Sequence, residues 1–422
     1  MAVTSPRRFL LATLGSTGDV HPFLALGSAL RAAGHTVTLL ADPKYKEAAK
    51  SAQVNFAPIP GTGVVPDLNG VIARMLETPD RVEQFETLYA GLAPVFGSLL
   101  DETLARLPEH DVLVSPYLFP FLKNAARKAG KKCAVLVFCP NNVPYGEIGP
   151  EDASTTPTWA PKVLQKLHHQ MSWAAEQRAL DGVVARHAGP LLRTRGLGAF
   201  HGFLRDPADR ALITVAEKLF PPPGPLPKNY VHTGFLRWRP TMNEPAAHDL
   251  ARVAALEQRG VPLPVLTFGS MSPTDAQAQF ARLLAAWPLG APLVVQSGGI
   301  QWPGDAARPE VLVIGPVPHE RLFERATLVI HHGGAGTTAA SLHAGRPQII
   351  IPHLGDQMYW AHMTQTLGVA HVLNREAWPE NLATKITEVL RDITLVRRAV
   401  ECAALIRAEN GAEKAVRELE SL

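Results

Sequence analysis

Glycines, histidines and threonines gather at one point in the second half of the chain. The apolar run 327–330 leads into His331, His332, Gly333, Gly334, Ala335, Gly336, Thr337 and Thr338. Glycines let the backbone approach a ligand closely, and a helix that begins there presents unpaired N–H groups with a partial positive charge. A glycine-rich turn with threonine caps is the alternative, but three glycines within four residues exceed what such a turn needs. The pattern therefore predicts a phosphate-binding loop.

The residues alone leave the identity of the phosphate ligand open. No Gly-Lys-Ser/Thr follows the loop, which excludes a P-loop. Gly334-x-Gly336-x-x-Ala339 matches the loose dinucleotide fingerprint, and Asp356 follows Gly336 by 20 residues. An NAD(P)-dependent oxidoreductase is thus an alternative. Against it, Asp356 falls in an expected loop after Pro352, and no acid/base constellation typical of dehydrogenases accompanies the fingerprint.

Short β-branched runs alternate with helical patterns in two stretches, at about 7–140 and 263–375. Runs that are apolar on both faces and alternate with helices are typical of parallel sheets. We predict an α/β fold of two doubly wound Rossmann-like domains facing each other across a cleft, with ligands at the carboxyl ends of the strands. The expected boundaries are a first domain at 1–236, a linker at 237–260, a second domain at 261–400 and a terminal helix at 401–422.

Composition narrows the class of protein. The 422 residues carry 41 Lys and Arg against 38 Asp and Glu, so the net charge of +3 does not favour nucleic acid as a partner. Three cysteines without a C-x-x-C pair indicate neither a disulfide scaffold nor a zinc ribbon. The apolar run at 9–14 is too short for a signal-peptide core or a bilayer span. We expect a cytoplasmic protein.

Four segments together resemble a known family. The match lies in HHGGAGTTAASLHAGRPQIIIPHLGDQMYWA (331–361), GSTGDVHPFLALGSALRAAGH (15–35), VHTGFL (231–236) and LTFGSM (266–271). These segments resemble the nucleotide-sugar glycosyltransferases of the GT-B fold, nearest to the bacterial branch that acts on antibiotics, sterols and rhamnolipid precursors. The resemblance implies that the first domain binds the acceptor, that the second binds the donor, and that the terminal helix crosses back to the first domain.

The resemblance also assigns the donor site, for a UDP- or dTDP-linked hexose or deoxyhexose. His331 matches the family histidine that contacts the pyrophosphate, whereas one histidine of the pair is expected to be structural. Asp356 and Gln357 match the pair that binds the sugar hydroxyls. The chain lacks the stacking Trp and the ribose-binding Glu of plant members, with Pro316 and Ala339 at those sites, so the nucleotide stays open. The full predicted donor set is Ser16, Thr17, Gly18, Gly269, Ser270, Val317, His331, Gly333, Gly334, Gly336, Thr337, Thr338, Asp356 and Gln357.

Asp19 is the candidate catalytic base. It occupies the position where plant-type relatives carry a catalytic His and bacterial relatives carry Asp. The required chemistry is removal of the acceptor hydroxyl proton as that oxygen attacks the anomeric carbon. His21 is an alternative base or a partner of Asp19, and a helix cap is the structural alternative for either residue. The chain has no Asp-x-Asp motif. We therefore expect no cofactor, no metal and inversion at the anomeric centre, the last implied by the resemblance.

Aromatic side chains in the first domain predict an apolar acceptor, small or lipid-like, that carries a hydroxyl. The predicted acceptor-binding residues are Phe85, Tyr117, Phe119, Asn142, Tyr145 and Trp173. A mildly basic amphipathic helix within 159–180 is either a solvated face or a weak contact with the inner face of a membrane. Besides the oxidoreductase, a catalytically silent protein that binds a nucleotide sugar is an alternative. The sequence does not indicate an oligomeric state.

Overall fold

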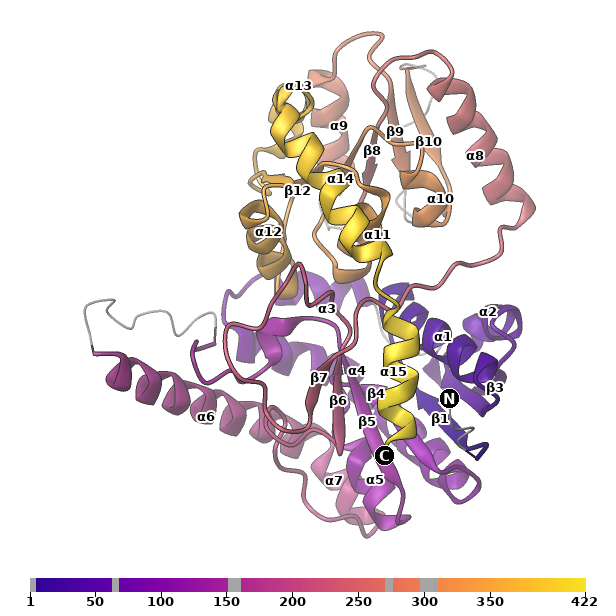
Figure 1. Ribbon diagram of the computed structural model, residues 1–422, viewed down its shortest axis with the longest axis vertical. Coiled ribbons are helices and arrows are strands. Elements are labelled where there is room, and N and C mark those ends of the chain that lie inside the picture. The colour runs from indigo at the N-terminus through magenta and orange to yellow at the C-terminus, as the bar shows by residue number, and fades with distance from the viewer. Residues whose placement is uncertain (1–4, 63–67, 151–160, 270–275, 297–307, 309) are drawn as a thin grey trace. The chain divides into compact units, whose positions relative to one another are not determined.

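The computed structural model describes residues 5–62, 68–150, 161–269, 276–296, 308 and 310–422 (Figure 1). The chain forms two compact units. Unit 1 comprises Met1–Trp238 together with Asn410–Leu422, and unit 2 comprises Arg239–Glu409. Each unit contains one parallel sheet with the Rossmann-like strand order, which confirms the predicted α/β class.

The sheet of unit 1 has the strand order β3-β2-β1-β4-β5-β6-β7, with every pair parallel. The central strands are buried on both faces, because their apolar residues pack against helices on either side. The strands are β1 (Arg8–Ala12), β2 (Thr36–Ala41), β3 (Asn55–Pro58), β4 (Val112–Pro116), β5 (Lys132–Val137), β6 (Arg210–Ile213) and β7 (Tyr230–His232).

The helices of unit 1 vary widely in length. The long helices α4 and α6 pack against each other, and the last helix, α15, packs against α1. The bounds are α1 (Thr17–Ala32), η1 (Pro43–Tyr45), α2 (Lys46–Ser51), α3 (Leu68–Met75), α4 (Arg81–Arg106), η3 (Leu107–Glu109), α5 (Leu122–Lys128), η4 (Pro140–Asn142), α6 (Lys162–His187), α7 (Gly189–Thr194) and α15 (Gly411–Glu420).

The sheet of unit 2 has the order β10-β9-β8-β11-β12-β13, again parallel throughout. Its strands are β8 (Pro264–Thr267), β9 (Leu293–Gln296), β10 (Val311–Ile314), β11 (Leu328–His331), β12 (Gln348–Ile350) and β13 (Ala370–Val372). The helices are α8 (Glu244–Glu257), α9 (Ala276–Ala286), α10 (His319–Phe323), α11 (Ala335–Ala344), α12 (Asp356–Thr366), α13 (Trp378–Arg391) and α14 (Ile393–Arg407).

Several predicted boundaries are wrong in detail. The expected linker at 237–260 contains helix α8, whose Val253 is buried in the core of unit 2. The expected terminal helix at 401–422 is two helices: α14 belongs to unit 2, and only α15 belongs to unit 1. The first strand series does not end near 140, because β6 and β7 extend the sheet.

The strand order places a topological switch point in each unit. In unit 1 the order reverses between β1 and β4, and in unit 2 it reverses between β8 and β11. Open parallel sheets bind ligands in the crevice outside the carboxyl ends of such strands. Asp19 follows β1, Gly269 follows β8, and His331 ends β11. The residues that the sequence singled out thus lie at the positions where this topology forms binding sites.

Candidate functional site

Asp19 is held in place by the start of helix α1. Ser16 is the N-cap residue, and both its backbone N–H and its hydroxyl donate to Oδ2 of Asp19, at 2.7 and 2.9 Å. Thr13 donates to the backbone carbonyl of Asp19 at 3.2 Å. Burial raises the pKa of Asp19, and the hydrogen bonds from Ser16 offset only part of that rise. A carboxylate with a raised pKa is better suited to accept a proton.

Two neighbours shape the turn that carries Asp19. Gly15 has φ of +140°, and a Cβ there would lie 2.3 Å from Oδ2 of Asp19, so only glycine fits. Tyr45, at the end of η1, donates from its hydroxyl to the carbonyl of Gly15 at 3.3 Å. Tyr45 was not among the predicted residues, because its contact with Gly15 depends on how η1 returns to the end of β1.

His21 is less suited to be the base. Burial lowers the pKa of this imidazole to about 4, so it is neutral at pH 7 and has little affinity for a proton. The other residues of the turn, predicted for the donor, are on the surface: Thr17 and Gly18 are exposed, and Ser16 is half-buried. Among the two candidates, the electrostatics favour Asp19.

His331 lies at the end of β11 and is fully buried. Its Nε2 lies 2.8 Å from Oε1 of Gln348, and the N–H of Gly333 donates to its Nδ1 at 3.0 Å. Because an amide oxygen only accepts, Nε2 carries the proton. Burial lowers the pKa of His331 to about 4, so the ring is neutral. In this arrangement both ring nitrogens are engaged within the protein, and the contact of His331 with a pyrophosphate stays a prediction.

The second histidine faces the glycine turns. A Cβ on Gly334 would lie 2.5 Å from Nε2 of His332, and a Cβ on Gly269 would lie 3.3 Å from its Cε1. The ring of His332 therefore lies between the turn after β8 and the turn after β11, and burial lowers its pKa well below the usual range. Ser270, the other residue predicted in the turn after β8, lies outside the described residues.

The glycines of the turn after β11 allow a ligand to approach the backbone closely. Gly333 has φ of +90°, and a Cβ there would collide with Ile350 at 2.9 Å. Gly334 caps helix α11, and Gly336 in the first turn is exposed with open space where a Cβ would be. The N–H groups of this first turn are thus accessible to an anion.

The two threonines after Gly336, predicted to contact the phosphates, have buried side chains. Thr338 has no exposed surface and Thr337 only 6%, so both side chains pack inside unit 2. The hydroxyl of Thr338 is buried without a partner among the described residues. The accessible part of the loop is backbone, and phosphate contact by these two hydroxyls stays a prediction.

Asp356 and Gln357 form the first turn of α12, after Gly355 with φ of +54°. Asp356 is half-buried. Gln357 is buried, and its Oε1 accepts the N–H of His353 at 2.8 Å. One atom of the predicted sugar-binding pair therefore stabilises its own turn, and the sugar contacts of both residues stay predictions.

Gln296 fixes the loop that contains Val317. Its Nε2 donates to the carbonyl of Val317 at 2.6 Å, while its Oε1 accepts from Thr267 and contacts Nε2 of His319 at 3.0 Å. This buried amide joins the ends of β8 and β9 to the predicted nucleobase loop. Gln296 was not among the predicted residues. Its position, as the polar last residue of the otherwise apolar strand β9, is the signal that could have identified it.

Three predicted acceptor residues lie together in unit 1. The amide of Asn142 donates to the hydroxyl of Tyr117 at 3.2 Å. The rings of Phe85 and Tyr117 both contact Phe203, at 5.0 and 6.4 Å between centroids. All three predicted residues are half-buried. They therefore form a partly exposed cluster of two aromatic rings and one amide. Phe203, which was not among the predicted residues, packs against both rings.

Two further predicted residues line a separate cavity, and one prediction is wrong. Tyr145 and Trp173 border a pocket of about 740 Å³ beside α6, and the indole N–H of Trp173 donates to the carbonyl of Ile148 at 2.7 Å. Phe119, in contrast, has no exposed surface and packs against Phe96 and Phe121. Phe119 is a core residue, because its ring is enclosed by this packing, and it does not line an acceptor site in this structure.

In the ranges of the chain that the structure describes, no helix is long and apolar enough to cross a membrane. The same ranges hold no cluster of three or more His, Cys, Asp or Glu side chains with the spacing of a metal site.

Two protein-family models match parts of the chain. Residues 9–96 match the glycosyltransferase family 28 N-terminal domain. Residues 295–422 match the erythromycin biosynthesis protein CIII-like C-terminal domain. The two matches fall on the segments around Asp19 and around the turn after β11.

Individual relatives extend over most of the chain. The vancomycin aglycone glucosyltransferase of Amycolatopsis orientalis is 30% identical, over 86% of this chain and 84% of its own. The O-mycaminosyltylonolide 6-deoxyallosyltransferase of Streptomyces fradiae is 26% identical, over 97% and 96%. The solved glycosyltransferase SsfS6 of Streptomyces sp. SF2575, complexed with thymidine diphosphate, superposes with a TM-score of 0.65 at 20% identity, over 99% of this chain and 100% of its own. The chain belongs to the nucleotide-sugar-dependent glycosyltransferases of the GT-B fold, in the branch that includes enzymes acting on antibiotics and sterols.

Proposed function

We propose that the enzyme transfers a hexose or deoxyhexose from a dTDP- or UDP-sugar to a hydroxyl of an apolar small-molecule or lipid-like acceptor, with inversion and with Asp19 as general base. Asp19 removes the proton of the acceptor hydroxyl, the acceptor oxygen bonds to the anomeric carbon, and the bond from that carbon to the diphosphate oxygen breaks. The electron pair leaves with the diphosphate. Attack opposite the leaving group inverts the centre.

The observation that carries the proposal is the setting of Asp19. A carboxylate that served only as a helix cap would gain from ionisation, because its hydrogen bonds favour the charged form. Here the cost of burial outweighs the bonds from Ser16, so the pKa of Asp19 is raised. Ionisable side chains whose pKa is shifted by burial are often found at functional sites. This property supports proton transfer, and it counts against the alternative of a catalytically silent protein.

The turn after β11 supports a role for unit 2 in stabilising the leaving diphosphate. The N–H groups in the first turn of α11, where Gly336 is exposed, offer a partial positive charge without a metal ion. His331 and His332 are neutral, since burial lowers the pKa of each. The anion is then stabilised by oriented dipoles rather than by charged side chains. This arrangement supports the proposal of a metal-independent reaction.

The relatives support the proposed substrate classes. One solved relative carries thymidine diphosphate, which favours dTDP over UDP. The vancomycin aglycone and O-mycaminosyltylonolide named for two relatives are bulky natural products. The aromatic cluster of Phe85, Tyr117 and Asn142 offers an apolar surface with a polar edge to such an acceptor.

A matrix of substrates tests this function. Sugars linked to dTDP and to UDP are incubated with hydroxylated macrolide, polyketide and sterol acceptors, with and without EDTA, and products are read by mass and by the NMR coupling at the anomeric centre. We expect transfer in at least one combination, unchanged by EDTA and with inverted configuration. A product with retained configuration, a loss of transfer with EDTA, or nucleotide-sugar binding without transfer in any combination would contradict the proposal.

A further inference from the structure

An open cavity of about 740 Å³ lies in unit 1. The residues that line it are distant in the sequence from the turn that carries Asp19. One wall is helix α6, with Leu167, Met171 and Trp173, and the opposite wall is the segment of Tyr145. Its volume lies within the ~300–1,000 Å³ that is usual for small-molecule sites. The indole of Trp173 joins the two walls by its bond to Ile148, so the cavity is a built feature of unit 1.

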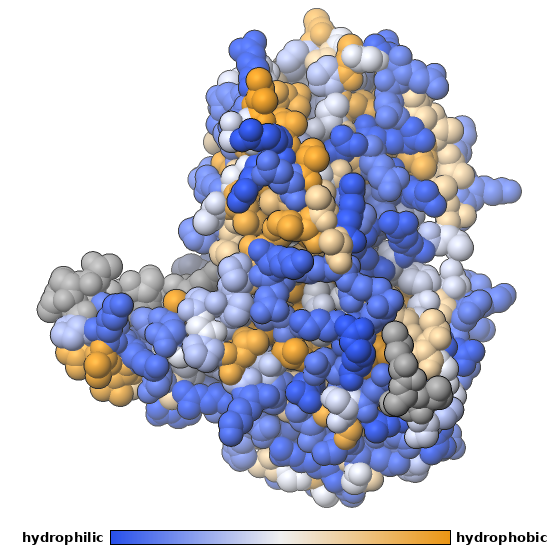
Figure 2. All heavy atoms as spheres, in the orientation of Figure 1, coloured by the Kyte–Doolittle hydropathy of each residue, from blue (hydrophilic) through white to orange (hydrophobic). Residues whose placement is uncertain are grey.

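The apolar side chains at this cavity are unusually exposed. Leu167 is 51% and Met171 64% exposed, and Ile148, Val163 and Leu164 beside them are exposed as well. Figure 2 shows the apolar patch at the projecting end of α6. Isolated apolar residues on a surface need no explanation, but a contiguous group beside a cavity is typical of a binding site.

Two guanidinium groups border the same cavity, from Arg178 on α6 and from Arg205. Each donates to a carbonyl of α6, Arg178 to Ala174 at 3.2 Å and Arg205 to Gln170 at 3.4 Å. Among the described residues neither has a carboxylate within 4.0 Å. The nearby acid Glu147 is already paired with Lys166 at 3.1 Å. The described surface of the cavity is therefore apolar with two uncompensated positive charges.

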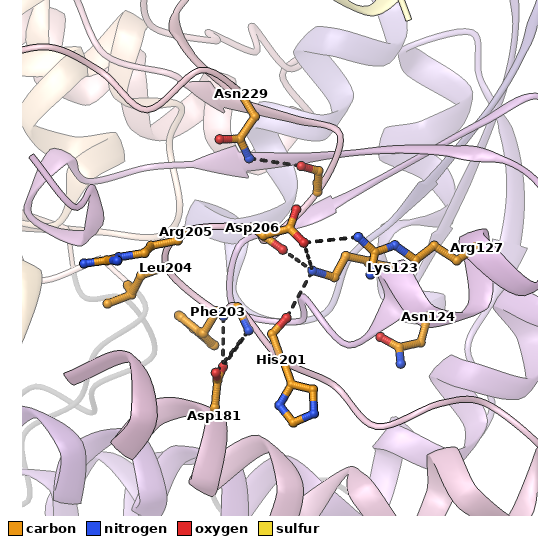
Figure 3. Close-up of polar contacts among 12 residues, drawn as sticks. Lys123, Asn124, Arg127, Asp181, His201, Phe203, Leu204, Arg205, Asp206 and Asn229 are labelled. Atoms are coloured by element: carbon orange, nitrogen blue, oxygen red, sulfur yellow. Dashed lines mark hydrogen bonds and ion pairs between the residues drawn. The ribbon is translucent and has the colours of Figure 1, made fainter. Parts of the chain in front are cut away.

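The backbone that carries Arg205 is anchored on both sides (Figure 3). The carboxylate of Asp181 accepts the N–H groups of Gly202 and Phe203, the latter at 2.9 Å, and the side chain of Gln177 accepts the N–H of Arg205 at 3.0 Å. The buried Lys123 donates to the carbonyl of His201 and forms an ion pair with Asp206. A guanidinium on an anchored backbone loses less freedom on binding, which favours recognition of an anion.

We propose that this cavity binds an amphipathic anion, a molecule with a bulky apolar body and one carboxylate, sulfonate or phosphate group. The body contacts Leu167, Met171 and the rings of Tyr145 and Trp173. The anionic group pairs with Arg178 and Arg205, whose planar guanidinium groups match two oxygens at once. The concave form of the cavity favours a single molecule over a bilayer surface. The proposal concerns binding and does not depend on sugar transfer.

A matched pair of fluorescent probes tests both parts of the proposal. The probe 8-anilinonaphthalene-1-sulfonate carries an anion, and N-phenyl-1-naphthylamine is the same skeleton without it. Each is titrated against the full chain and against Arg178→Gln/Arg205→Gln. We expect the double variant to bind the sulfonate about 10-fold more weakly, since two charge-assisted hydrogen bonds are lost, and to bind the neutral probe as before. Arg193→Gln, on the exposed face of α7, is the control and should change neither titration.

Ala174→Trp fills the cavity and should weaken both probes, with thermal unfolding recorded to verify that the variant is folded. Unchanged sulfonate binding in the double variant, or unchanged binding of both probes in folded Ala174→Trp, would overturn the proposal. Binding of the protein to phosphatidylglycerol vesicles that needs both arginines, without an effect on the sulfonate titration, would assign the surface to a bilayer and also overturn it. Asp19→Asn should leave both probes unaffected, so this test is separate from that of the transferase function.

Discussion

Ser16 directs two donors, its backbone N–H and its hydroxyl, to the same oxygen of Asp19, at 2.7 and 2.9 Å. Both hydrogen bonds from Ser16 thus reach Oδ2 and fix the carboxylate at the start of α1. The proposed function assigns the other oxygen, Oδ1, to the substrate hydroxyl. The arrangement separates the structural role of Asp19 from the proposed chemical role.

Replacing Ser16 by Ala should change the pH dependence of transfer. The hydroxyl of Ser16 lowers the pKa of Asp19, against the larger effect of burial. Without the hydroxyl the pKa rises further, so the acid limb of kcat/KM moves to higher pH, while activity well above that limb changes little. The measurement is a pH profile of kcat/KM for Ser16→Ala beside Ser172→Ala, a hydroxyl bonded only within α6. An acid limb that moves to lower pH would show that Asp19 is not the titrating base.

Gln348 should stabilise the turn after β11 through His331. Replacement of Gln348 by Leu leaves the buried Nε2–H of His331 without an acceptor, which costs about 1–3 kcal/mol of the free energy of unfolding. The N–H of Gly333 is held by the same ring, so dTDP should bind more weakly as well. Urea unfolding and calorimetric titration with dTDP measure the two effects. Gln365→Leu, at an exposed position of α12, is the control. Equal unfolding free energies and equal dTDP affinities for the two variants would refute this role of Gln348.

Helix α15 should dock on unit 1 only if residue 411 has no side chain. A Cβ on Gly411 would lie 2.6 Å from the carbonyl carbon and oxygen of Gly234 and from the carbonyl oxygen of Phe235. Gly411→Ala should therefore lower the free energy of unfolding by about 1–3 kcal/mol, as overpacking usually does. Gly198→Ala, where a Cβ meets nothing within 4 Å, is the control in the same unit. If thermal unfolding gives both variants the same midpoint, α15 does not pack as described.

The fold was predictable where apolar runs are long and bounded by Gly or Pro. The strands before Gly15, Gly269 and Gly333 are of this kind, and their loops carried the family motifs. Strands β6 and β7 were missed because Arg210–Ile213 and Tyr230–His232 are short and lie on either side of a proline-rich loop. Local periodicity contains too little information for such short strands.

The sequence motifs identified residues of the candidate site, but they did not predict which side chains contact one another. The pairing of His331 with Gln348 follows from the register of β11 and β12, in which His331 is opposite Ile350. Two residues along β12, Gln348 lies on the same face of the sheet as that position. Phe119 shows the converse limit, since an aromatic residue after a strand can be either core or pocket, and only packing distinguishes the two.

The most direct test of the account is Asp19→Asn, with turnover, dTDP affinity and thermal unfolding measured on the same preparation. Loss of the base should lower turnover about 10²–10⁴-fold, with unchanged dTDP affinity. Burial raises the pKa of Asp19 in the folded state, so folding disfavours ionisation, and stability falls as pH rises from the unfolded pKa through the raised folded value. At pH 7 the neutral amide avoids this cost, so the unfolding midpoint should stay the same or rise. Turnover near that of the wild type would contradict the central claim that Asp19 is the base.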